Sequence, residues 1–518
     1  MQVLLPQPVL TILRTLETNG FEAFVVGGSL RDILMGREPK DWDITTNAKP
    51  EEIQKLFTDS VYKNEFGTVG VKTPRFLKNT PGSHDTDIVE VTTYRSESSY
   101  SDQRHPDQVT FVKTIEEDLA RRDFTINAMA AKIVKHEAYS IEHTTKNTSS
   151  MLHAPCSMNI IDPFHGQADL KSKIIRAVGN PEERFGEDAL RILRAIRLVT
   201  ELSSGTWKTE RLDWTIEPAT WAALTKLASR IGVLSIERIR DEFSRVILSS
   251  HPRQGIELLH EAGALGYFLP ELERGIGVTQ NLHHIYTVWE HNLRALETCP
   301  SSKLSVRIAA LMHDIAKPET KRGEGYRATF YNHDHAGARV TKRVLERLRY
   351  PKKVVEHASM LVDNHLFYYN VGEVTEASVR RLLRRVGLDN MDDLMAVRIG
   401  DRLGSGVPKA KPYKLRHLEY MIDKVSQDAI SVKMLKVNGA ELMQELKLQP
   451  GPKIGAILDC LLAEVIEDAE KNKQDILLDR ARELMDTDLD TLRTLARERI
   501  DERRGEDDRH IKNTHRVS

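Results

Sequence analysis

The sequence predicts an α+β domain at the N-terminus followed by a long all-α region. Segments with the pattern of short strands, among them FEAFVVGG, GTVGV, DIVEVTTY and AMAAKIV, alternate with helix-period segments up to about residue 180. From Pro181 onward helical periodicity continues almost to the end, as in EDALRILRAIRLV and SIERIRDEFSRVIL. The 518 residues suffice for about three or four domains, each with its own core.

Composition excludes several classes of protein. The chain carries 75 Lys and Arg against 76 Asp and Glu, and 40% of its residues are hydrophobic, which is typical of a globular protein rather than a disordered or fibrous one. No apolar stretch of about 18 residues runs without charge, so we expect no membrane span. The three cysteines are widely spaced without a CxxC pair, which argues against a disulfide framework or a structural zinc site and favours a cytoplasmic location: Cys156, Cys299 and Cys460.

The first segments predict a helix, a strand and an anion-binding turn. Apolar residues at helical spacing between Val9 and Leu16 predict an amphipathic helix near the N-terminus. The strand FEAFVV then enters Gly27-Gly28-Ser29-Leu30-Arg31-Asp32. Glycines let a backbone approach a phosphate, and the N–H groups at a helix start point toward it. A diglycine after a strand is more often a plain turn, so this element alone leaves both interpretations open.

Two aspartates follow at a spacing that suits a metal site. Asp41 and Asp43 are two residues apart, and residues at that spacing on a strand face the same side. Such paired carboxylates bind Mg²⁺, which can activate a hydroxyl group and stabilise a leaving pyrophosphate. Glu90 shares one face of IVEVTTY with Ile88 and Thr92 and could complete the acidic cluster. A solvated acidic strand end is the competing interpretation.

Two arginine-containing segments complete the first candidate site. Arg122 and Asp123 lie in RRDFTINAMA. Further on, four polar residues recur at every third position beside the apolar Leu190, Leu193 and Ile196: Asp188, Arg191, Arg194 and Arg197. Charge series of this kind are usually the solvated face of a helix, and the spacing alone does not exclude that.

Taken in order, these segments resemble a known family. GGSLRD with DWD, the loop RSESSYSDQRHPDQV, RRDFTINAMA, DPFHGQADL and EDALRILRAIR are similar to the motifs of the class II tRNA nucleotidyltransferase and poly(A) polymerase family. The resemblance implies a head with a polymerase-β-like nucleotidyltransferase fold, followed by an all-α neck, body and tail. It implies that Asp41 and Asp43 hold Mg²⁺. It also implies nucleotide-binding roles for these residues: Gly28 and Arg31 at the incoming nucleotide, Arg122 and Asp123 at its ribose and phosphates, Asp188 and Arg191 at the base, Arg194 and Arg197 at the triphosphate.

The chemistry of Asp188 and Arg191 can also be argued without the family. A carboxylate accepts hydrogen bonds and a guanidinium donates them, so the pair complements a base edge with an amino group beside a ring acceptor nitrogen. Cytosine and adenine present that edge, whereas uracil and guanine present the reverse. One protein surface can therefore select CTP and ATP, which fits addition of C, C and A to a tRNA 3′ end without a nucleic-acid template.

Within the family the sequence leaves alternatives open. The segment EFGTVGV followed by VEVTTYR is similar to the tRNA-repair branch rather than to bacterial poly(A) polymerases with a basic GRRFR-like segment. The loop from Arg95 to Pro106 has full length, which favours CCA addition over CC addition, but an enzyme that adds only A would keep the same loop. An RNA-binding protein with inactive sites, or a hydrolase whose head only delivers RNA, are the alternatives of other classes.

A second set of residues resembles the HD-domain phosphohydrolases. The pattern H…HD…D corresponds to His291, His313, Asp314 and Asp401, and His335 and His365 are candidates for a second metal or a substrate phosphate. Imidazole and carboxylate ligands suit a divalent metal. The resemblance implies a metal-activated water that attacks a phosphorus ester, in particular 2′,3′-cyclic phosphodiesterase or phosphatase activity. A relic domain that only packs helices is the alternative.

The motifs divide the chain into four predicted regions, namely a nucleotidyltransferase head (1–176), a neck with the base-recognition helix (177–275), an HD domain (276–405) and a tRNA-binding tail (406–518). Because the net charge is only -1, binding of tRNA requires local basic clusters such as the one at Arg380, Arg381, Arg384 and Arg385. Gly451 to Gly455 before a helix could offer N–H groups to a phosphate. The last residues, RERIDERRGEDDRHIKNTHRVS, predict a charged, frayed terminus.

Overall fold

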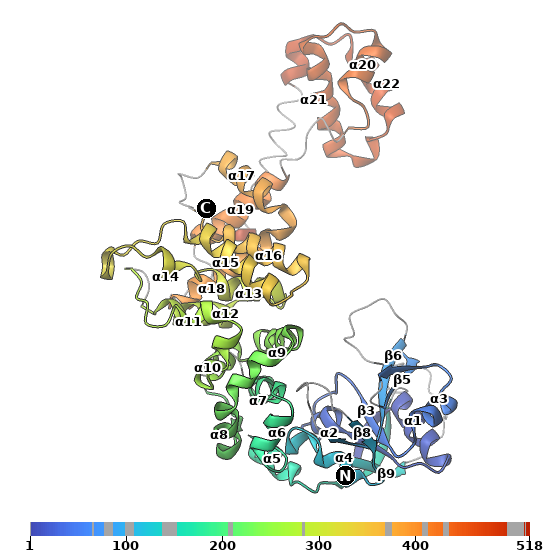
Figure 1. Ribbon diagram of the computed structural model, residues 1–518. Coiled ribbons are helices and arrows are strands. Elements are labelled where there is room, and N and C mark those ends of the chain that lie inside the picture. Colours follow the sequence, from blue (N-terminus) through green and yellow to red (C-terminus); the bar gives the residue numbers. More distant parts are fainter. Residues whose placement is uncertain are drawn as a thin grey trace.

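The computed structural model confirms the predicted fold class (Figure 1). An α+β head is followed by a chain of helices that leads away from it, and the parts succeed one another in an elongated arrangement. The residues that the structure describes are 2–64, 67–76, 86–98, 108–136, 153–205, 211–281, 285–367, 375–406, 413–427, 435–494, 512 and 514–517.

The head contains an eight-stranded mixed sheet. Its only parallel pair among the described strands is β3 with β6, and all other neighbours are antiparallel. In sheet order the strands are β1 (Gln2–Pro6), β10 (His153–Ile161), β9 (Ala130–His136), β2 (Ala23–Val26), β3 (Asp43–Thr46), β6 (Thr86–Thr93), β5 (Thr68–Pro74) and β4 (Ser60–Asn64). A separate hairpin joins β7 (Arg95–Ser98) to β8 (Gln108–Phe111).

The start of the chain differs in part from the expectation. The predicted amphipathic helix is α1 (Gln7–Thr18), and its apolar residues from Val9 to Leu16 are buried as expected. The five residues before it form β1, which the sequence pattern did not indicate. β1 pairs with β10, about 150 residues further along the chain, so the pairing is decided by tertiary contact rather than by local preference. The other head helices are α2 (Gly27–Leu34), α3 (Pro50–Leu56) and α4 (Ile115–Ala120).

The two polar interruptions at 73–86 and 135–157 fall where antiparallel strands follow each other. β5 pairs with β6, and β9 pairs with β10, so each interruption connects the two arms of a hairpin. Residues 77–85 and 137–152 lie outside the described residues. Both stretches are rich in Thr, Ser, His and Asn, which predicts loops or hairpin extensions. Their described ends lie in hairpin arms, and for the remaining residues the expectation stays a prediction.

Beyond the head the structure is almost entirely helical. Among the described residues of this region, strand pairing consists of the isolated bridge between Arg322 and Thr329 and two short elements that the helical pattern did not predict, β11 (Ile174–Ile175) and β12 (Thr215–Ile216). The first group of helices comprises α5 (Gly166–Ser172), α6 (Pro181–Glu187), α7 (Leu190–Leu202), α8 (Pro218–Lys226), α9 (Ile236–Leu248), α10 (Pro252–Glu261) and α11 (Pro270–Glu273). The second comprises α12 (Val288–Thr298), α13 (Leu304–Met312), α14 (Lys317–Thr320), α15 (His333–Arg347), α16 (Lys352–Asp363), α17 (Glu376–Val386), α18 (Met391–Gly404) and α19 (Tyr413–Gln427).

The buried side chains form separate cores. One continuous apolar core runs from Phe124 through both groups of helices to Val425. The head has its own core around the large sheet. A third, smaller core joins α20 (Gly439–Leu446), α21 (Pro452–Glu467) and α22 (Gln474–Leu484), which we call the tail domain (residues 435–494). The first of these cores spans the neck helices and the helices α12 to α19, which we call the body. Since this core crosses the proposed boundaries at residues 275 and 405, the domain boundaries at residues 176, 275 and 405 stay predictions.

The C-terminus corrects one expectation. The described residues Thr514 to Val517 are not frayed, because Val517 is buried in the core that includes α19. The three cysteines are buried, and no disulfide bond joins any of them. In the described part of the chain no helix has the length and apolar character needed to cross a bilayer.

Candidate nucleotide-transfer site and metal centre

The diglycine turn brings the backbone of the head against two predicted site residues. Gly27 opens α2 directly after β2 with φ of 67°, a conformation that favours glycine. A Cβ atom at Gly27 would lie 2.9 Å from Nη1 of Arg122 and 3.4 Å from Oδ2 of Asp43. Glycine is therefore needed here both for its backbone conformation and for the space it leaves. The family resemblance had assigned the contact with the incoming nucleotide to Gly28 rather than to Gly27.

The carboxylates of the head come from adjacent strands. Asp43 is the first residue of β3 and stands in register with Glu90 on the parallel strand β6. The N–H of Glu90 donates to the carbonyl of Trp42 at 3.0 Å, which fixes this register. Neighbouring strands are roughly 4.8 Å apart, so Asp43 and Glu90 are close partners. Asp41 precedes the strand and is exposed, so it does not share a strand face with Asp43 as the spacing had suggested.

The donor set of these three residues fits Mg²⁺, because it consists of carboxylate oxygens only. The structure does not gather them into one tight group. In the described part of the chain, two groups of three ligand atoms lie within 4.8 Å of one another, and neither includes Asp41, Asp43 or Glu90. A metal role for these residues therefore stays a prediction that their chemistry supports.

Asp118 holds the arginines of the RRD segment. The buried carboxylate of Asp118 accepts from Arg121 at 2.8 Å and from Arg122 at 3.3 Å. Burial raises the pKa of Asp118, but the two guanidinium groups outweigh it and lower that pKa. Arg122 is thus fixed close to Gly27 and, across it, to Asp43. Asp118 was not singled out from the sequence, although its position three and four residues before two arginines is a recognisable helical spacing.

A chain of hydrogen bonds connects the head with α7. Arg31 donates to the side-chain oxygen of Asn127 at 2.9 Å, and Asn127 donates to Asp123 at 3.2 Å. The other oxygen of Asp123 accepts from Nε of Arg194 at 2.8 Å. Burial raises the pKa of Asp123, yet Arg194 and Arg191 outweigh it, so the pKa lies well below its usual range. Arg31, Asp123 and Arg194, far apart in sequence, therefore belong to one site.

The polar stripe of α7 is not a solvated face. Arg191 donates to Glu187 at 2.5 Å and to the carbonyl of Arg184 at 3.0 Å. Nε of Arg197 lies 2.7 Å from Glu242 on α9. Both arginines are buried. Burying a guanidinium costs free energy unless a carboxylate accompanies it. These buried, paired arginines therefore indicate an ordered binding site rather than a solvated helix face.

Asp188 forms an ion pair with Arg238, a partner that could not be predicted from the sequence. It ends α6, and its two oxygens accept from Nη1 and Nη2 of Arg238 at 3.2 and 2.7 Å. Oδ1 also accepts from the N–H of Leu190 at the start of α7. Arg238 and Glu242 stand four residues apart on α9 and face Asp188 and Arg197, respectively. Their i, i+4 spacing was visible in SIERIRDEF, but their partners were not.

The six His and Asp residues of the second site lie in two adjoining groups, one of His291, His313 and Asp401 and one of Asp314, His333 and His365. Nε2 of His291 lies 2.9 Å from Nε2 of His313 and 3.2 Å from Oδ1 of Asp401. Asp314 joins the groups, since Oδ2 lies 3.2 Å from His291 and Oδ1 lies 3.1 Å from His333. The cluster is almost wholly buried.

The orientation of the imidazoles fits metal binding. Nδ1 of His313, His333 and His365 each faces the carbonyl three residues earlier, at 2.8, 2.6 and 2.7 Å. When Nδ1–H donates to a carbonyl, Nε2 carries the lone pair and points into the cluster. Burial lowers the pKa of His313, but Asp314 and Asp401 outweigh it and raise the pKa to about 10. The carboxylates thus create a field that favours a cation at this position.

The structure does not place His335, predicted as a candidate for a second metal or a substrate phosphate, among the cluster residues. His335 lies outside the cluster, with 54% of its side chain exposed and Nδ1 2.7 Å from Asp363. His333, two residues earlier on α15, takes the place by Asp314. Residues two apart on an α-helix point about 200° apart, so His333 and His335 cannot both face the cluster. His365, the other predicted candidate, lies in the cluster as expected.

Acidic neighbours partly neutralise the predicted basic clusters, which comprise the one on α17 and a second one at Lys342, Arg343, Arg347, Arg349, Lys352 and Lys353. Arg347 forms an ion pair with Glu271 at 2.6 Å, and Arg380 with Glu376 at 3.0 Å. Arg381, Arg384 and Arg385 on α17 are exposed or half-buried. The segment Gly451 to Gly455 was predicted to precede a helix, but α21 already begins at Pro452, so the segment forms the first turn of that helix. These placements leave α17 and the tail domain as candidates for contact with RNA.

A mixed sheet with carboxylates on two adjacent interior strands, joined through arginines to a helical neck, defines a nucleotidyltransferase-like site. Residues 23–176 match the family described as poly(A) polymerase head domain, and residues 213–276 match "Probable RNA and SrmB- binding site of polymerase A". Residues 329–481 match the family described as "tRNA nucleotidyltransferase domain 2", which covers much of the second site and the tail domain.

Whole-length relatives point in the same direction. The chain is 30% identical over 501 residues to a CCA-adding enzyme of Pediococcus pentosaceus, covering 92% of this chain and 98% of that protein. It is 31% identical over 480 residues to one of Lactococcus lactis subsp. lactis, covering 92% and 96%. The crystal structure of the Bacillus stearothermophilus CCA-adding enzyme in complex with CTP matches with a TM-score of 0.54 and 25% identity, covering 92% and 96%. The chain belongs to the class II tRNA nucleotidyltransferase and poly(A) polymerase family.

Proposed function

We propose that this protein adds C, C and A to the 3′ end of tRNA from CTP and ATP, with Mg²⁺ and without a nucleic-acid template. The observation that carries this proposal is the hydrogen-bonded chain Arg31–Asn127–Asp123–Arg194. It joins α2, the helix that follows the diglycine turn of the head, to the helix that begins beside Asp188 and carries Arg191. Phosphate chemistry and base selection can therefore occur in one site. The CCA-adding enzymes among its whole-length relatives support the same activity.

The residues of the head would hold and orient the triphosphate. Mg²⁺, held by Asp41, Asp43 and Glu90, would activate the terminal hydroxyl of the tRNA and stabilise the departing pyrophosphate. The backbone around Gly28 and the guanidinium of Arg31 would bind phosphate oxygens at the start of α2. Arg122, fixed by Asp118, would stand across the turn from Asp43 and neutralise charge beside the metal. Asp123 would orient Arg194 toward the triphosphate while Arg197 keeps α7 attached to α9.

Base selection would fall to Asp188 and Arg191. The carboxylate of Asp188 would accept from the amino group of cytosine or adenine, and Arg191 would donate to the ring nitrogen beside it. Because Arg238 and Glu187 already contact these two side chains, an incoming base has to share or displace them. Asp188 and Arg191 would therefore favour the base edge of cytosine or adenine over that of uracil or guanine. A base with the wrong edge would displace the existing partners and leave buried charges unpaired.

The test is extension of a tRNA transcript that ends at the base preceding CCA, resolved to single nucleotides. CTP alone should add two residues, CTP with ATP should add three, and ATP alone should add none. Addition by ATP only to a transcript that already ends in CC would instead identify an A-adding enzyme. Long A tracts would identify a poly(A) polymerase.

We propose a second activity, hydrolysis of phosphate esters such as 2′,3′-cyclic phosphates, at the His/Asp cluster. The buried cluster with three Nε2 atoms pre-oriented by carbonyl partners favours a working metal centre over a relic. The bound divalent metal would activate a water molecule for attack on phosphorus. Lys317, 2.6 Å from Asp314, would hold that carboxylate in place. Hydrolysis of 2′,3′-cyclic AMP, measured with several divalent metals and with the apoprotein, tests this proposal.

In this account the regions divide the work. The head (1–176) transfers nucleotides, the neck (177–275) selects them, the HD region (276–405) hydrolyses phosphate esters, and the region after it (406–518) holds tRNA. Binding of tRNA by truncated chains that lack the tail domain, compared with the full chain, tests the last assignment.

A further inference from the structure

The C-terminal residues return to the body after the chain has passed through the tail domain. α19 is the last helix before the tail domain, and the end of the chain lies beside α19 rather than beside α20–α22 (Figure 1). Val517 is only 7% exposed and belongs to the same apolar core as Leu418 and Met421 on α19. The tail domain has a separate core. The last residues thus belong structurally to the body.

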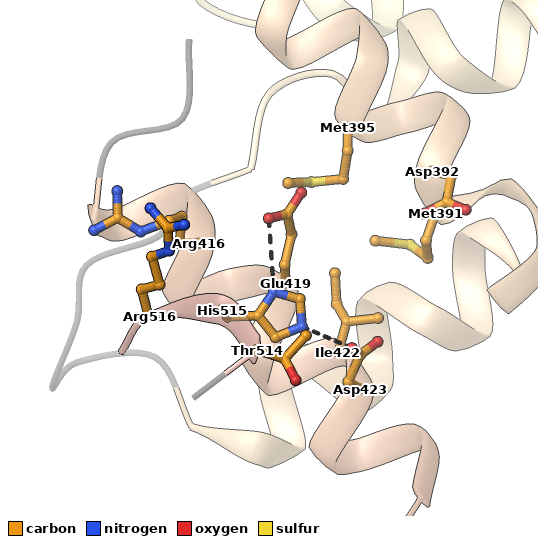
Figure 2. A pocket seen from close by; sticks show the side chains of 10 residues that line it. All are labelled: Met391, Asp392, Met395, Arg416, Glu419, Ile422, Asp423, Thr514, His515 and Arg516. Carbon is orange, nitrogen blue, oxygen red and sulfur yellow. Dashed lines mark hydrogen bonds and ion pairs between the residues drawn. The ribbon is translucent and has the colours of Figure 1, made fainter. Parts of the chain in front are cut away.

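A histidine and its two acidic neighbours hold this segment (Figure 2). The ring of His515 lies between two carboxylates of α19, with Nε2 2.7 Å from Asp423 and Nδ1 3.9 Å from Glu419. The N–H of Val517 donates to the carbonyl of Lys512 at 2.9 Å and closes a turn. Nζ of Lys512 lies 5.9 Å from the ring of Tyr420. Apolar burial and polar contacts therefore act on the same short segment.

The segment and the surface that receives it are complementary in charge. A cavity of about 520 Å³ lies where they meet, and Figure 2 shows its lining. The segment lines the cavity with Thr514, His515 and Arg516. The body supplies three carboxylates, one guanidinium and three apolar side chains: Asp392, Glu419 and Asp423, Arg416, and Met391, Met395 and Ile422. Because carboxylates outnumber the single guanidinium on the body's side, this surface suits a basic segment that also buries a valine.

The path of the chain means that this contact restricts the tail domain. The chain leaves the body after Gln427, forms the tail domain from residue 435 to 494, and returns to α19 at residues 512–517. The family match that includes the tail domain ends at residue 481, so the returning segment lies beyond it. With the segment docked, the tail domain is attached to the body at both ends. A domain closed into a loop has fewer orientations available than one attached at a single end.

We propose that residues 512–517 form an intramolecular clasp that binds the α18–α19 surface and fastens the tail domain for tRNA binding. The tRNA part rests on the proposed function. A tail domain with restricted orientations loses less conformational entropy when tRNA binds, so the clasp lowers KM for tRNA without taking part in the chemical step. The docking surface itself recognises a basic segment that buries Val517, whatever the chain's activity.

The first test measures docking directly. A labelled peptide of residues 508–518 should bind a chain truncated after residue 511 and should not bind the full chain, in which the site is filled. Asp423→Asn with Glu419→Gln should weaken binding of the peptide by about tenfold or more, whereas Glu346→Gln, an exposed charge on α15 outside the cavity lining, should leave it unchanged. Equal binding to the full and truncated chains, or no binding to either, would overturn the clasp.

The second test measures the consequence. Truncation, or Val517→Asp in the full chain, should increase the maximum dimension in small-angle scattering and raise KM for tRNA by about three- to tenfold while kcat stays within about twofold. A lower kcat with unchanged KM would contradict the proposed role. If the unaltered chain extends no tRNA, the proposed function fails, but peptide binding and scattering still decide whether the clasp exists.

Discussion

The nucleotide-transfer site and the His/Asp centre are built in opposite ways. The first is spread over the head and the neck, and each of its arginines already contacts a carboxylate, as Arg194 does with Asp123 and Arg197 with Glu242. The second is compact and buried, with imidazoles pre-oriented by the backbone. A site that accepts several bases in succession benefits from partners that can be exchanged. A metal centre benefits from ligands that cannot turn away.

The largest expected effect comes from replacing a single carboxylate, Asp43, which should abolish one activity and leave the other unchanged. Asp43→Asn should reduce nucleotide addition by roughly a thousandfold or more, because it removes a metal ligand at the reacting phosphate. Hydrolysis at the His/Asp centre should not change. Parallel kinetic assays of tRNA extension and of 2′,3′-cyclic AMP hydrolysis measure this, with Asp59→Asn, an exposed head residue paired with Lys72, as the control. Loss of both activities together would show that the sites are not independent.

The converse change should spare nucleotide addition. His313→Ala removes an imidazole at the centre of the cluster and should reduce ester hydrolysis by about a hundredfold or more, with less metal retained by the purified protein. Elemental analysis and hydrolysis rates provide the measurement. His335→Ala is the matched control, since His335 is exposed and contacts Asp363 instead. Equal losses in both variants would contradict the position assigned to His335.

A smaller effect is expected on base choice. Asp188→Ala should reduce the preference for CTP over UTP by about ten- to a hundredfold, because a base contact of this kind contributes roughly 1–3 kcal/mol of discrimination. The preference is measured as the ratio of kcat/KM values for each nucleotide. Glu182→Gln on the same α6, exposed and paired with Lys226, should leave the ratio unchanged. Full selectivity in the Asp188 variant would falsify the base-reading assignment.

The smallest effect is one of stability. The Asp123–Arg194 ion pair lowers the pKa of Asp123 in the folded protein, so its contribution is complete above the unfolded pKa of about 3.9 and is lost as pH falls through the folded value. Asp123→Asn should therefore destabilise the protein by roughly 1–3 kcal/mol near pH 7, and the difference should shrink below about pH 4. Denaturant unfolding of both proteins across pH measures this. A difference that is constant down to the lowest pH would contradict the ion-pair explanation.

The sequence predicts most of the fold because its patterns are local. The amphipathic helix from Val9 to Leu16 and the strand that carries Glu90 follow from periodicity alone. β1 was missed because its partner β10 is distant in sequence. The C-terminal segment was predicted to fray because its composition is charged, whereas a single valine and a histidine dock it on α19.

The sequence predicted which residues belong to the candidate sites, but not which side chains they contact. Spacing and resemblance indicated Asp188 and the HD pair, but the Arg238 and Glu242 partners depend on how α9 packs against α7, which no local pattern reveals. The choice of His335 over His333 failed for a related reason. Both lie in one short segment, and only the rotation of α15 decides which faces the cluster.

The most direct test of the central claim is the sequence of the nucleotides that the protein adds when all four nucleoside triphosphates are present at equal concentration. A tRNA transcript lacking its last three residues is incubated with the protein and Mg²⁺, and the 3′ ends of the products are sequenced. The account predicts ends that read CCA and then stop, because Asp188 and Arg191 accept cytosine and adenine and reject uracil and guanine. Ends of mixed sequence, or tracts of A without C, would contradict a protein template that selects C, C and A.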